Sequence, residues 1–227
     1  MFLCNICNAE LVEFNSQATC SFCGTVEVAE YICKNQHYVC EDCRLANQQE
    51  IIERVCFNTS SANPIELANL IMKHPSFNAY GVEHHEMVAA VLLISLWNLN
   101  LSGMTESRIK GAMKRSAKIP YGSCGSMGTC GACVSAGVAV AMYSKSNYLK
   151  DKERNASLKT VSRSLLKLSE LGGPRCCKYS TYVSIQTAWQ VLADDFNLPL
   201  QPLTVVCEFQ DKLKDCHKDH CPFYQKR

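Results

Sequence analysis

The chain has 227 residues, enough for one or two domains with a buried core, and its charges nearly balance at a formal net charge of +2. That balance argues against a strongly basic nucleic-acid binder, and the longest apolar run, 87–97, is too short to span a bilayer. The composition is unusual in its sixteen cysteines. Because the N-terminal residues MFLCNICNAE lack the regions of a signal peptide, we expect a cytoplasmic metalloprotein rather than a secreted disulfide framework.

Residues 1–45 contain four closely spaced pairs of metal-ligand side chains. Zinc takes four nitrogen or sulfur ligands in a tetrahedron, and a pair from one tight turn supplies half of such a site. Short β-prone runs separate the pairs, as in a zinc-ribbon or treble-clef-like module. The pattern therefore predicts two Zn²⁺ ions held by eight ligands: Cys4, Cys7, Cys20, Cys23, Cys33, His37, Cys40 and Cys43.

Two pairings of these ligands satisfy the spacing. In the sequential pairing the first pair joins the second, Cys20 and Cys23, and the third joins the fourth. In the interleaved pairing, which resembles a RING-type cross-brace, the first pair joins the third and the second joins the fourth. The sequence does not choose between them. Such modules serve nucleic-acid, protein and purely structural roles alike, so the metal prediction carries no function.

The rest of the chain is expected to be helical. The segment 46–63 is expected to contain most of a helix that runs from Cys43 to Val55, followed by a polar linker. A Cys-rich all-helical domain is expected over 64–227. The predicted fold is mainly α, a bundle of about six helices behind the small N-terminal module. Apolar periodicity and capping signals place helices over 64–73, 83–99, 105–117 and 155–171, and from Cys177 or Ser180 to Phe196.

The stretch 119–142, IPYGSCGSMGTCGACVSAGVAVAM, is predicted to organise that domain. It reads as a Gly-rich loop that leads into a buried helix, and Cys130 and Cys133 lie in its first turn. A helix N-terminus carries partial positive charge and favours thiolates or an anionic cluster. We therefore expect an iron–sulfur cluster, of the 4Fe–4S type, held by Cys124, Cys130 and Cys133 with Cys176 or Cys177.

The C-terminal tail is the second Cys-rich part of this domain. It is expected to begin as an extended segment, LTVVCEF, which contains Cys207. Two further cysteines follow, Cys216 and Cys221. These thiols are predicted to bind a second cluster; the alternative is a zinc site completed by His217 or His220.

Four residues are candidates for catalysis. Cys177 lies next to Arg175 and is expected to act as a nucleophile, while Arg175 holds an anionic group. His84 or His85, at the start of the apolar helix, is expected to move protons. For each of them a packed or solvated structural role is the competing interpretation.

Several motifs together resemble a known family. The sequences CKNQHYVCEDC, EHHEMVAAVLL, IPYGSCGSMGTCGACVSAG and GGPRCCKYSTYVSI, with a C-x8-C-x4-CPF tail, resemble an uncharacterised Cys-rich domain family of anaerobic archaea and bacteria. That family is sometimes attached to radical-SAM enzymes. The resemblance implies anaerobic metal chemistry and no named substrate.

These observations predict an iron–sulfur protein with a structural zinc module that works in anaerobic sulfur-centred chemistry. It would be an iron–sulfur-dependent lyase or sulfurtransferase acting on a small sulfur-containing or anionic substrate. It would otherwise be an accessory to a partner redox or radical-SAM enzyme. The alternatives are a zinc-only adaptor that binds protein or nucleic acid, and a metallochaperone.

Overall fold

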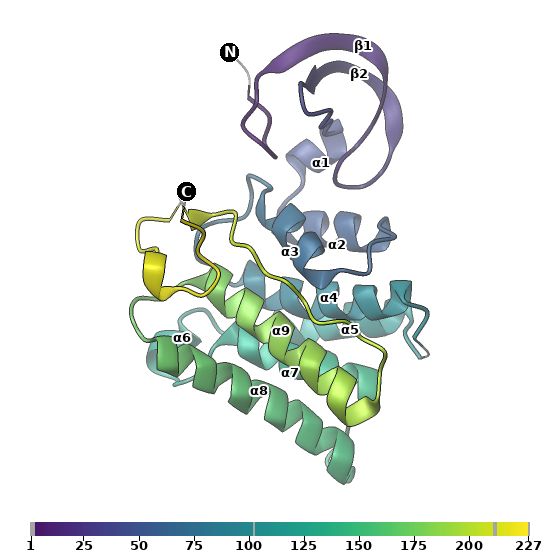
Figure 1. The fold of residues 1–227 in the computed structure, drawn as a ribbon. Helices are drawn as coiled ribbons and strands as arrows, with labels where there is room; N and C mark the ends of the chain where they lie inside the picture. The colour runs from purple at the N-terminus through teal and green to yellow at the C-terminus, as the bar shows by residue number, and fades with distance from the viewer. Residues whose placement is uncertain (1–2, 102, 211–212, 227) are drawn as a thin grey trace. The chain divides into compact units, whose positions relative to one another are not determined.

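The computed structural model describes residues 3–101, 103–210 and 213–226, and the chain divides into two compact units (Figure 1). The first unit comprises Met1–Ser61 and Glu66–Asn78, and the second comprises Ala62–Ile65 and Ala79–Arg227. The described residues are mostly helical with one small N-terminal sheet, so the mainly α prediction is confirmed.

The sheet of the first unit is a two-stranded antiparallel hairpin. Strand β1 (Leu11–Thr19) pairs with β2 (Val26–Cys33), with an irregularity in register between Glu13 and Ser16. Its small core consists of Ala18, Ala29 and Ile32. A two-stranded hairpin is marginally stable by itself, so this part of the unit needs support from elsewhere.

Two helices follow where the sequence predicted one. Helix α1 (Glu41–Leu45) ends at Ala46, and α2 (Gln48–Phe57) begins after Asn47. The Asn47 side chain accepts hydrogen bonds from the backbone N–H groups of Gln49 and Glu50, and the Glu50 carboxylate accepts one from the Asn47 N–H. This capping box starts a new helix and explains why the predicted helix from Cys43 to Val55 is interrupted.

The segment after α3 (Pro64–Met72) is anchored within the first unit by His74. Its buried ring lies edge-on to Phe22 at 5.3 Å between centroids. The Nε2 atom donates to the Cys43 carbonyl over 2.7 Å, so Nδ1 is the acceptor towards Ser76. Burial lowers the pKa of His74, which keeps the ring neutral at physiological pH.

The second unit is a helical bundle with α7 (Gly131–Ser144) at its centre, as the sequence predicted. Helix α7 packs against four others: α4 (Glu83–Asn98), α5 (Glu106–Ser116), α8 (Asp151–Leu171) and α9 (Cys177–Phe196). The short α6 (Ser123–Ser126) lies in the Gly-rich loop before it. Helix α8 begins four residues earlier than predicted. Among the described helices, none combines the length and apolar character needed to cross a membrane.

Small residues allow the neighbouring helices to approach α7 closely. A Cβ atom at Gly137 would collide with Val161 of α8, and one at Gly131 would collide with the ring of His85 on α4. Ser135 of α7 is bonded to the His85 carbonyl and lies 2.9 Å from the Ser116 hydroxyl. The central position of α7 is thus a consequence of its small side chains.

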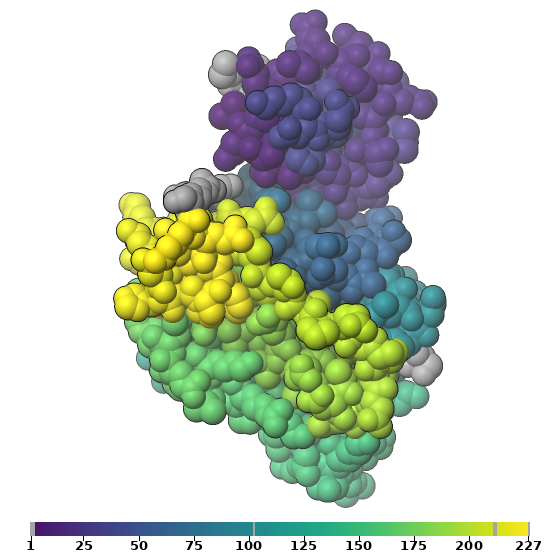
Figure 2. All heavy atoms as spheres, in the orientation of Figure 1, coloured from purple at the N-terminus to yellow at the C-terminus, as the bar shows by residue number. Residues whose placement is uncertain are grey.

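The tail packs on the bundle without forming a strand in its described part. The ring of Phe223 contacts Tyr179 and Tyr182 of α9 at 5.6 and 5.5 Å between centroids. The Cys207 N–H donates to the Phe223 carbonyl over 3.0 Å, which closes the tail into a loop around the 3₁₀ helix η2 (Lys218–His220). In Figure 2 this tail is the yellow surface beside the green helices of the same unit.

Candidate metal centres and a cysteine-lined pocket

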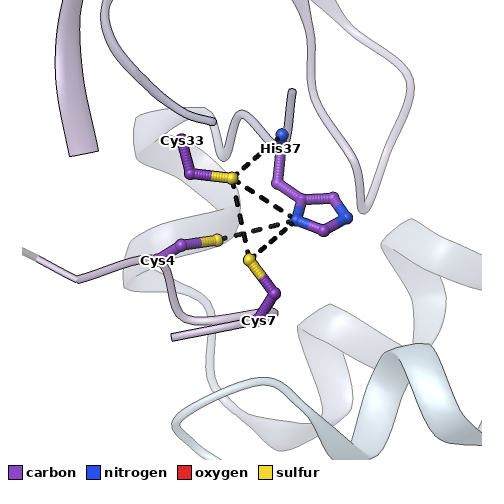
Figure 3. A group of neighbouring side chains, drawn as sticks. All are labelled: Cys4, Cys7, Cys33 and His37. Atoms are coloured by element: carbon purple, nitrogen blue, oxygen red, sulfur yellow. Dashed lines mark hydrogen bonds between the residues drawn. The ribbon is translucent and has the colours of Figure 1, made fainter. Parts of the chain in front are cut away.

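The first metal-ligand set consists of Cys4, Cys7, Cys33 and His37, whose ligand atoms all lie within 4.8 Å of one another (Figure 3). The Nδ1 atom of His37 lies 3.3 Å from the Cys7 sulfur, 3.5 Å from the Cys33 sulfur and 3.8 Å from the Cys4 sulfur. The Cys7 and Cys33 sulfurs are 3.7 Å apart. The edges of a zinc tetrahedron built from known bond lengths are roughly 3.5–3.8 Å, so the set matches one such ion.

The second set consists entirely of cysteines: Cys20, Cys23, Cys40 and Cys43, again within 4.8 Å of one another. All four are buried, and the Cys23 and Cys40 sulfurs are 3.7 Å apart. Cys20 and Cys23 lie in the turn between β1 and β2, while Cys43 lies in α1. The hairpin turn and the start of the helix are therefore held by one site.

The pairing of the ligands is the interleaved one. The first pair along the chain joins the third, and the second joins the fourth. Each site consequently binds together segments that lie well apart in sequence, and the two sites together fasten the N-terminus, the hairpin and α1. The two sets can each hold a metal ion, and they provide the support that a marginal hairpin lacks.

Backbone and side-chain donors surround the sulfurs of these sets. The Ile6 N–H donates to Cys4 over 3.4 Å, and the Cys40 N–H donates to Cys20 over 3.4 Å. Burial opposes ionisation of Cys7, but hydrogen bonds from the Ala9 backbone and the Asn35 amide lower its pKa to about 6. Donors directed at sulfur favour the thiolate, which is the form that binds metal.

The Gly-rich loop, the start of α9 and the second half of α8 enclose a cavity of about 890 Å³ in the second unit. We call it the central pocket. Cysteines from two separated segments line it: Cys124 and Cys130 from the loop, and Cys176 and Cys177 from the start of α9. Helix α8 contributes mainly apolar side chains to the lining, Leu165, Leu166, Leu168 and Leu171, together with two serines, Ser162 and Ser169. The structure therefore brings together the two cysteine motifs that the sequence placed at one site.

Arg175 is the one arginine or lysine among the described residues that line the central pocket, and that lining includes no carboxylate. Its guanidinium lies over the ring of Tyr80 at 5.0 Å and over that of Tyr121 at 5.8 Å. A hydrogen bond with Tyr121 raises the pKa of Arg175. This fixed cation, with the N-termini of α7 and α9, gives the pocket an electrostatic preference for anions.

Cys130 and Cys133 differ sharply in their surroundings. Cys130 is the N-cap residue of α7 and lines the central pocket, whereas Cys133 lies one turn further on, fully buried, and is not part of the lining. The hydrogen bond from Cys133 lowers the pKa of Cys130, and the same bond raises the pKa of Cys133. The Ser184 hydroxyl also donates to Cys133 over 3.5 Å.

Four thiols converge on a second, smaller cavity, which we call the tail cavity. It is lined by Cys176, Cys207, Cys216 and Cys221. Its walls are mainly aromatic and aliphatic side chains: Tyr179, Tyr182, Leu213, Phe223 and Tyr224. Burial, together with the charges of the other three thiols, raises the pKa of Cys207 to about 11, although a hydrogen bond from the Phe209 backbone opposes the shift. Among the described residues, no three of these tail-cavity sulfurs all lie within 4.8 Å of one another, unlike the ligand atoms of each N-terminal set.

A buried charged network lies beside these thiols. The Lys178 ammonium donates to His84 Nε2 over 2.8 Å and lies 5.2 Å from the centroid of the Phe209 ring. His84 Nδ1 therefore carries the proton and donates to the Gly81 carbonyl over 3.1 Å. Burial and the nearby Lys178 charge lower the pKa of His84. Burial also lowers the pKa of Lys178, to about 8, although the charges of Cys177 and Glu83 oppose that shift.

The four candidate catalytic residues therefore do not all lie at one site. Cys177, Arg175 and His85 line the central pocket, but His84 does not and is 1% exposed. The ring of His85 lies against Gly131, and its Nδ1 atom has no hydrogen-bond partner among the described residues. Lys178 was not among the residues predicted from the sequence. It stands out in the structure as a buried lysine in a helix that is buried along most of its length.

Three residues line both cavities, and Cys176 is the one cysteine among them; the other two are Tyr179 and His217. Its neighbour Cys177 lines the central pocket, so the adjacent cysteines have different surroundings. His217 of the tail is also shared, and its Nε2 atom donates to the Pro174 carbonyl over 2.7 Å. The fourth thiol at the tail cavity is therefore Cys176, which does not belong to the tail sequence.

A family model covers most of the second unit. Residues 52–224 match the family of unknown function DUF5714, and the chain belongs to that family. The match is consistent with the uncharacterised domain family that the motifs resembled. Neither the curated proteins nor the solved structures contain a match to this chain. The family carries no described activity, so function has to be argued from the geometry of the sites.

Proposed function

We propose that this chain is an iron–sulfur protein with two structural zinc ions, and that it serves anaerobic sulfur-centred chemistry in the central pocket. The observation that carries the proposal is the convergence of Cys176, Cys207, Cys216 and Cys221 on the tail cavity. Four thiolates are the usual ligand set of a 4Fe–4S cluster, whose size requires sulfurs to stand further apart than around one ion.

The surroundings of the tail cavity suit such a cluster. Its aromatic and aliphatic walls exclude water, and solvent exclusion is one of the factors that set a cluster's potential. Lys178, buried beside Cys176, supplies positive charge to an otherwise anionic assembly. A bound cluster would supply electron transfer or a Lewis-acidic iron, and the shared residue Cys176 would link it to the central pocket.

The zinc assignment rests on the two N-terminal sets. Their ligand types, Cys₃His and Cys₄, are those of closed structural zinc sites, and their interatomic distances match a tetrahedron. All four positions of each site come from protein, so neither leaves a place for substrate. The first unit would accordingly have a structural or docking role.

Metal analysis of protein purified without oxygen tests the proposal. About two zinc ions, about four irons and about four acid-labile sulfides per chain are expected, with a brown absorption band. The variant Cys216→Ser should lose most of the iron and sulfide but keep the zinc. The matched control is Cys124→Ser, which removes an exposed thiol of the central pocket and should keep the iron.

Two outcomes contradict this assignment. Iron that is lost in Cys124→Ser and retained in Cys216→Ser would place the cluster at the central loop, with Cys124, Cys130 and Cys133 as ligands. A third zinc with no iron would identify a zinc-only adaptor. In that case the tail thiols would hold the extra ion.

A further inference from the structure

The segment Cys130-Gly131-Ala132-Cys133 joins an accessible thiol to a buried one. Cys130 caps the 14-residue helix α7 and lines the central pocket of about 890 Å³. Cys133 lies behind it, fully buried, and the Ser184 hydroxyl contacts its sulfur. One thiol is thus presented to a ligand in the pocket, and the other is withheld from it.

The two thiols are also electrostatically unequal. Cys133 donates its hydrogen bond to Cys130, which lowers the pKa of Cys130 and raises its own. The N-terminal end of α7 favours negative charge at the same position. Cys130, at the N-cap position and on the pocket lining, is thus the thiol placed to act as nucleophile, and the buried Cys133 lies behind it. A nucleophile with a protonated partner one helical turn away is the arrangement of a dithiol redox pair.

We propose that Cys130 and Cys133 are a redox-active dithiol that reduces a small organic disulfide bound in the central pocket. This inference goes beyond the iron–sulfur function, because the reaction uses only side chains of this chain and its substrate. It also gives Cys130 and Cys133 a role other than cluster ligation.

The reaction balances in two displacements. The Cys130 thiolate attacks one sulfur of a disulfide R–S–S–R′, so that the S–S bond breaks, a Cys130–S–S–R bond forms and R′–S⁻ leaves. The leaving thiolate takes the proton of Cys133. The Cys133 sulfur then attacks the Cys130 sulfur, which forms the Cys130–Cys133 disulfide and releases R–S⁻. The protein dithiol loses two electrons, and the substrate disulfide gains them.

The lining of the central pocket selects the substrate class. Arg175 provides a fixed cation, and no carboxylate is present among the described lining residues. The leucines of α8 add apolar surface to the same lining. The preferred substrate is therefore an organic disulfide with anionic ends and short hydrocarbon arms, rather than a neutral or cationic one.

Trapping the mixed disulfide tests the proposal. The full chain, purified without oxygen, is treated at pH 7 with 3,3′-dithiodipropionate, and mass spectrometry follows the tryptic peptide 119–145, which contains Cys124, Cys130 and Cys133. In the wild-type chain the peptide should lose two hydrogens as the Cys130–Cys133 disulfide forms. In Cys133→Ser, which keeps a hydroxyl donor but cannot resolve the intermediate, a mercaptopropionate adduct should accumulate on Cys130.

Cys124 is an internal control in the same peptide because it is exposed. Cys130 should react on the order of tenfold faster than Cys124 in Cys133→Ser, since the N-terminus of α7 favours negative charge on its sulfur. Replacing the probe with neutral bis(2-hydroxyethyl) disulfide should slow the reaction several-fold, and Arg175→Gln should remove that preference.

Three results would overturn the proposal. In the first, wild-type Cys130 and Cys133 remain free thiols after treatment. In the second, adducts form on Cys124 as fast as on Cys130. In the third, Cys130→Ser loses iron as Cys216→Ser does, which would make Cys130 a cluster ligand. A chain that binds no iron but forms the Cys130–Cys133 disulfide would refute the iron–sulfur proposal and leave the dithiol intact.

Discussion

In the first unit eight ligand atoms form two sets, each with its atoms within 4.8 Å of one another, whereas the cysteines of the second unit, except Cys133, line two cavities. The hairpin of the first unit has a small hydrophobic core of three buried residues, Ala18, Ala29 and Ile32. The second arrangement rests on a packed bundle, in which α7 contacts four helices before any metal is considered. Metal is therefore expected to hold the hairpin region of the first unit, whereas side-chain packing is expected to hold the second unit.

The largest effect should come from breaking one N-terminal set. Cys40→Ser removes a ligand of the Cys₄ set, and structural zinc sites contribute roughly 10–16 kcal/mol of apparent binding free energy. We expect the loss of one zinc and the unfolding of the hairpin region, measured by metal content and limited proteolysis. The control Cys56→Ala removes a buried thiol of the same unit that belongs to neither set, and it should keep both zinc ions.

Cobalt substitution of Cys40→Ser distinguishes the interleaved from the sequential pairing of the zinc ligands. With interleaved pairing, the ion that remains in Cys40→Ser is bound by Cys4, Cys7, Cys33 and His37. Its visible and charge-transfer absorption should be that of three sulfurs and one nitrogen. A spectrum of four sulfurs would instead mean that the ligands pair sequentially.

The second unit should respond to the loss of a buried charge. Lys178→Met keeps the aliphatic stem but leaves His84 Nε2 buried without its donor, which should lower the free energy of unfolding by roughly 1.5–3 kcal/mol. Both tryptophans, Trp97 and Trp189, lie in this unit, so their fluorescence during denaturant unfolding reports its stability.

Lys159→Met is the matched control for Lys178. Its ammonium forms an ion pair with Asp195 at 2.7 Å, but the lysine side chain is 37% exposed. Solvent screening limits such pairs to about 1 kcal/mol or less. Equal losses in the two variants would contradict the view that the Lys178 charge is desolvated and hydrogen-bonded.

A smaller and more variable effect is expected from filling the space beside α7. In Gly137→Ala the new methyl group would collide with Val161 of α8, and overpacking of this kind costs about 1–3 kcal/mol. At Gly125 a Cβ atom would meet nothing within 4 Å, so Gly125→Ala should leave the unfolding midpoint unchanged. Adding Val161→Ala should restore part of the stability lost in Gly137→Ala. If the double variant did not regain stability, the close packing of α7 against α8 would not be the cause of the stability lost in Gly137→Ala.

Much of this architecture could be predicted from local sequence. Three C-x2-C pairs and one C-x3-H pair identified the eight residues of the two N-terminal sets, because two ligands in one turn are a local property. Continuous apolar runs located α4 and α7, and apolar patterns with end signals located α5 and α9, each to within a few residues. The mainly α fold and the central position of α7 followed from the same signals.

Other features lay beyond local sequence. The capping box at Asn47 divides a stretch whose apolar pattern is continuous, and His74 ties a segment beyond the polar linker to the first unit through one hydrogen bond to Cys43. The prediction placed the domain boundary at that linker. Composition reports where the chain is polar, but it does not report which distant segment a histidine will contact.

The sequence by itself determined that this protein is Cys-rich and mainly helical, and that its N-terminal pairs can bind metal. Only the tertiary structure decided how those pairs combine, because interleaved and sequential sites have identical spacing. It also placed Cys176 with the tail thiols and Cys177 with the Gly-rich loop, although the two are adjacent in sequence. The physical reason is that local preferences set turns and helix ends, whereas long-range packing decides which of them meet.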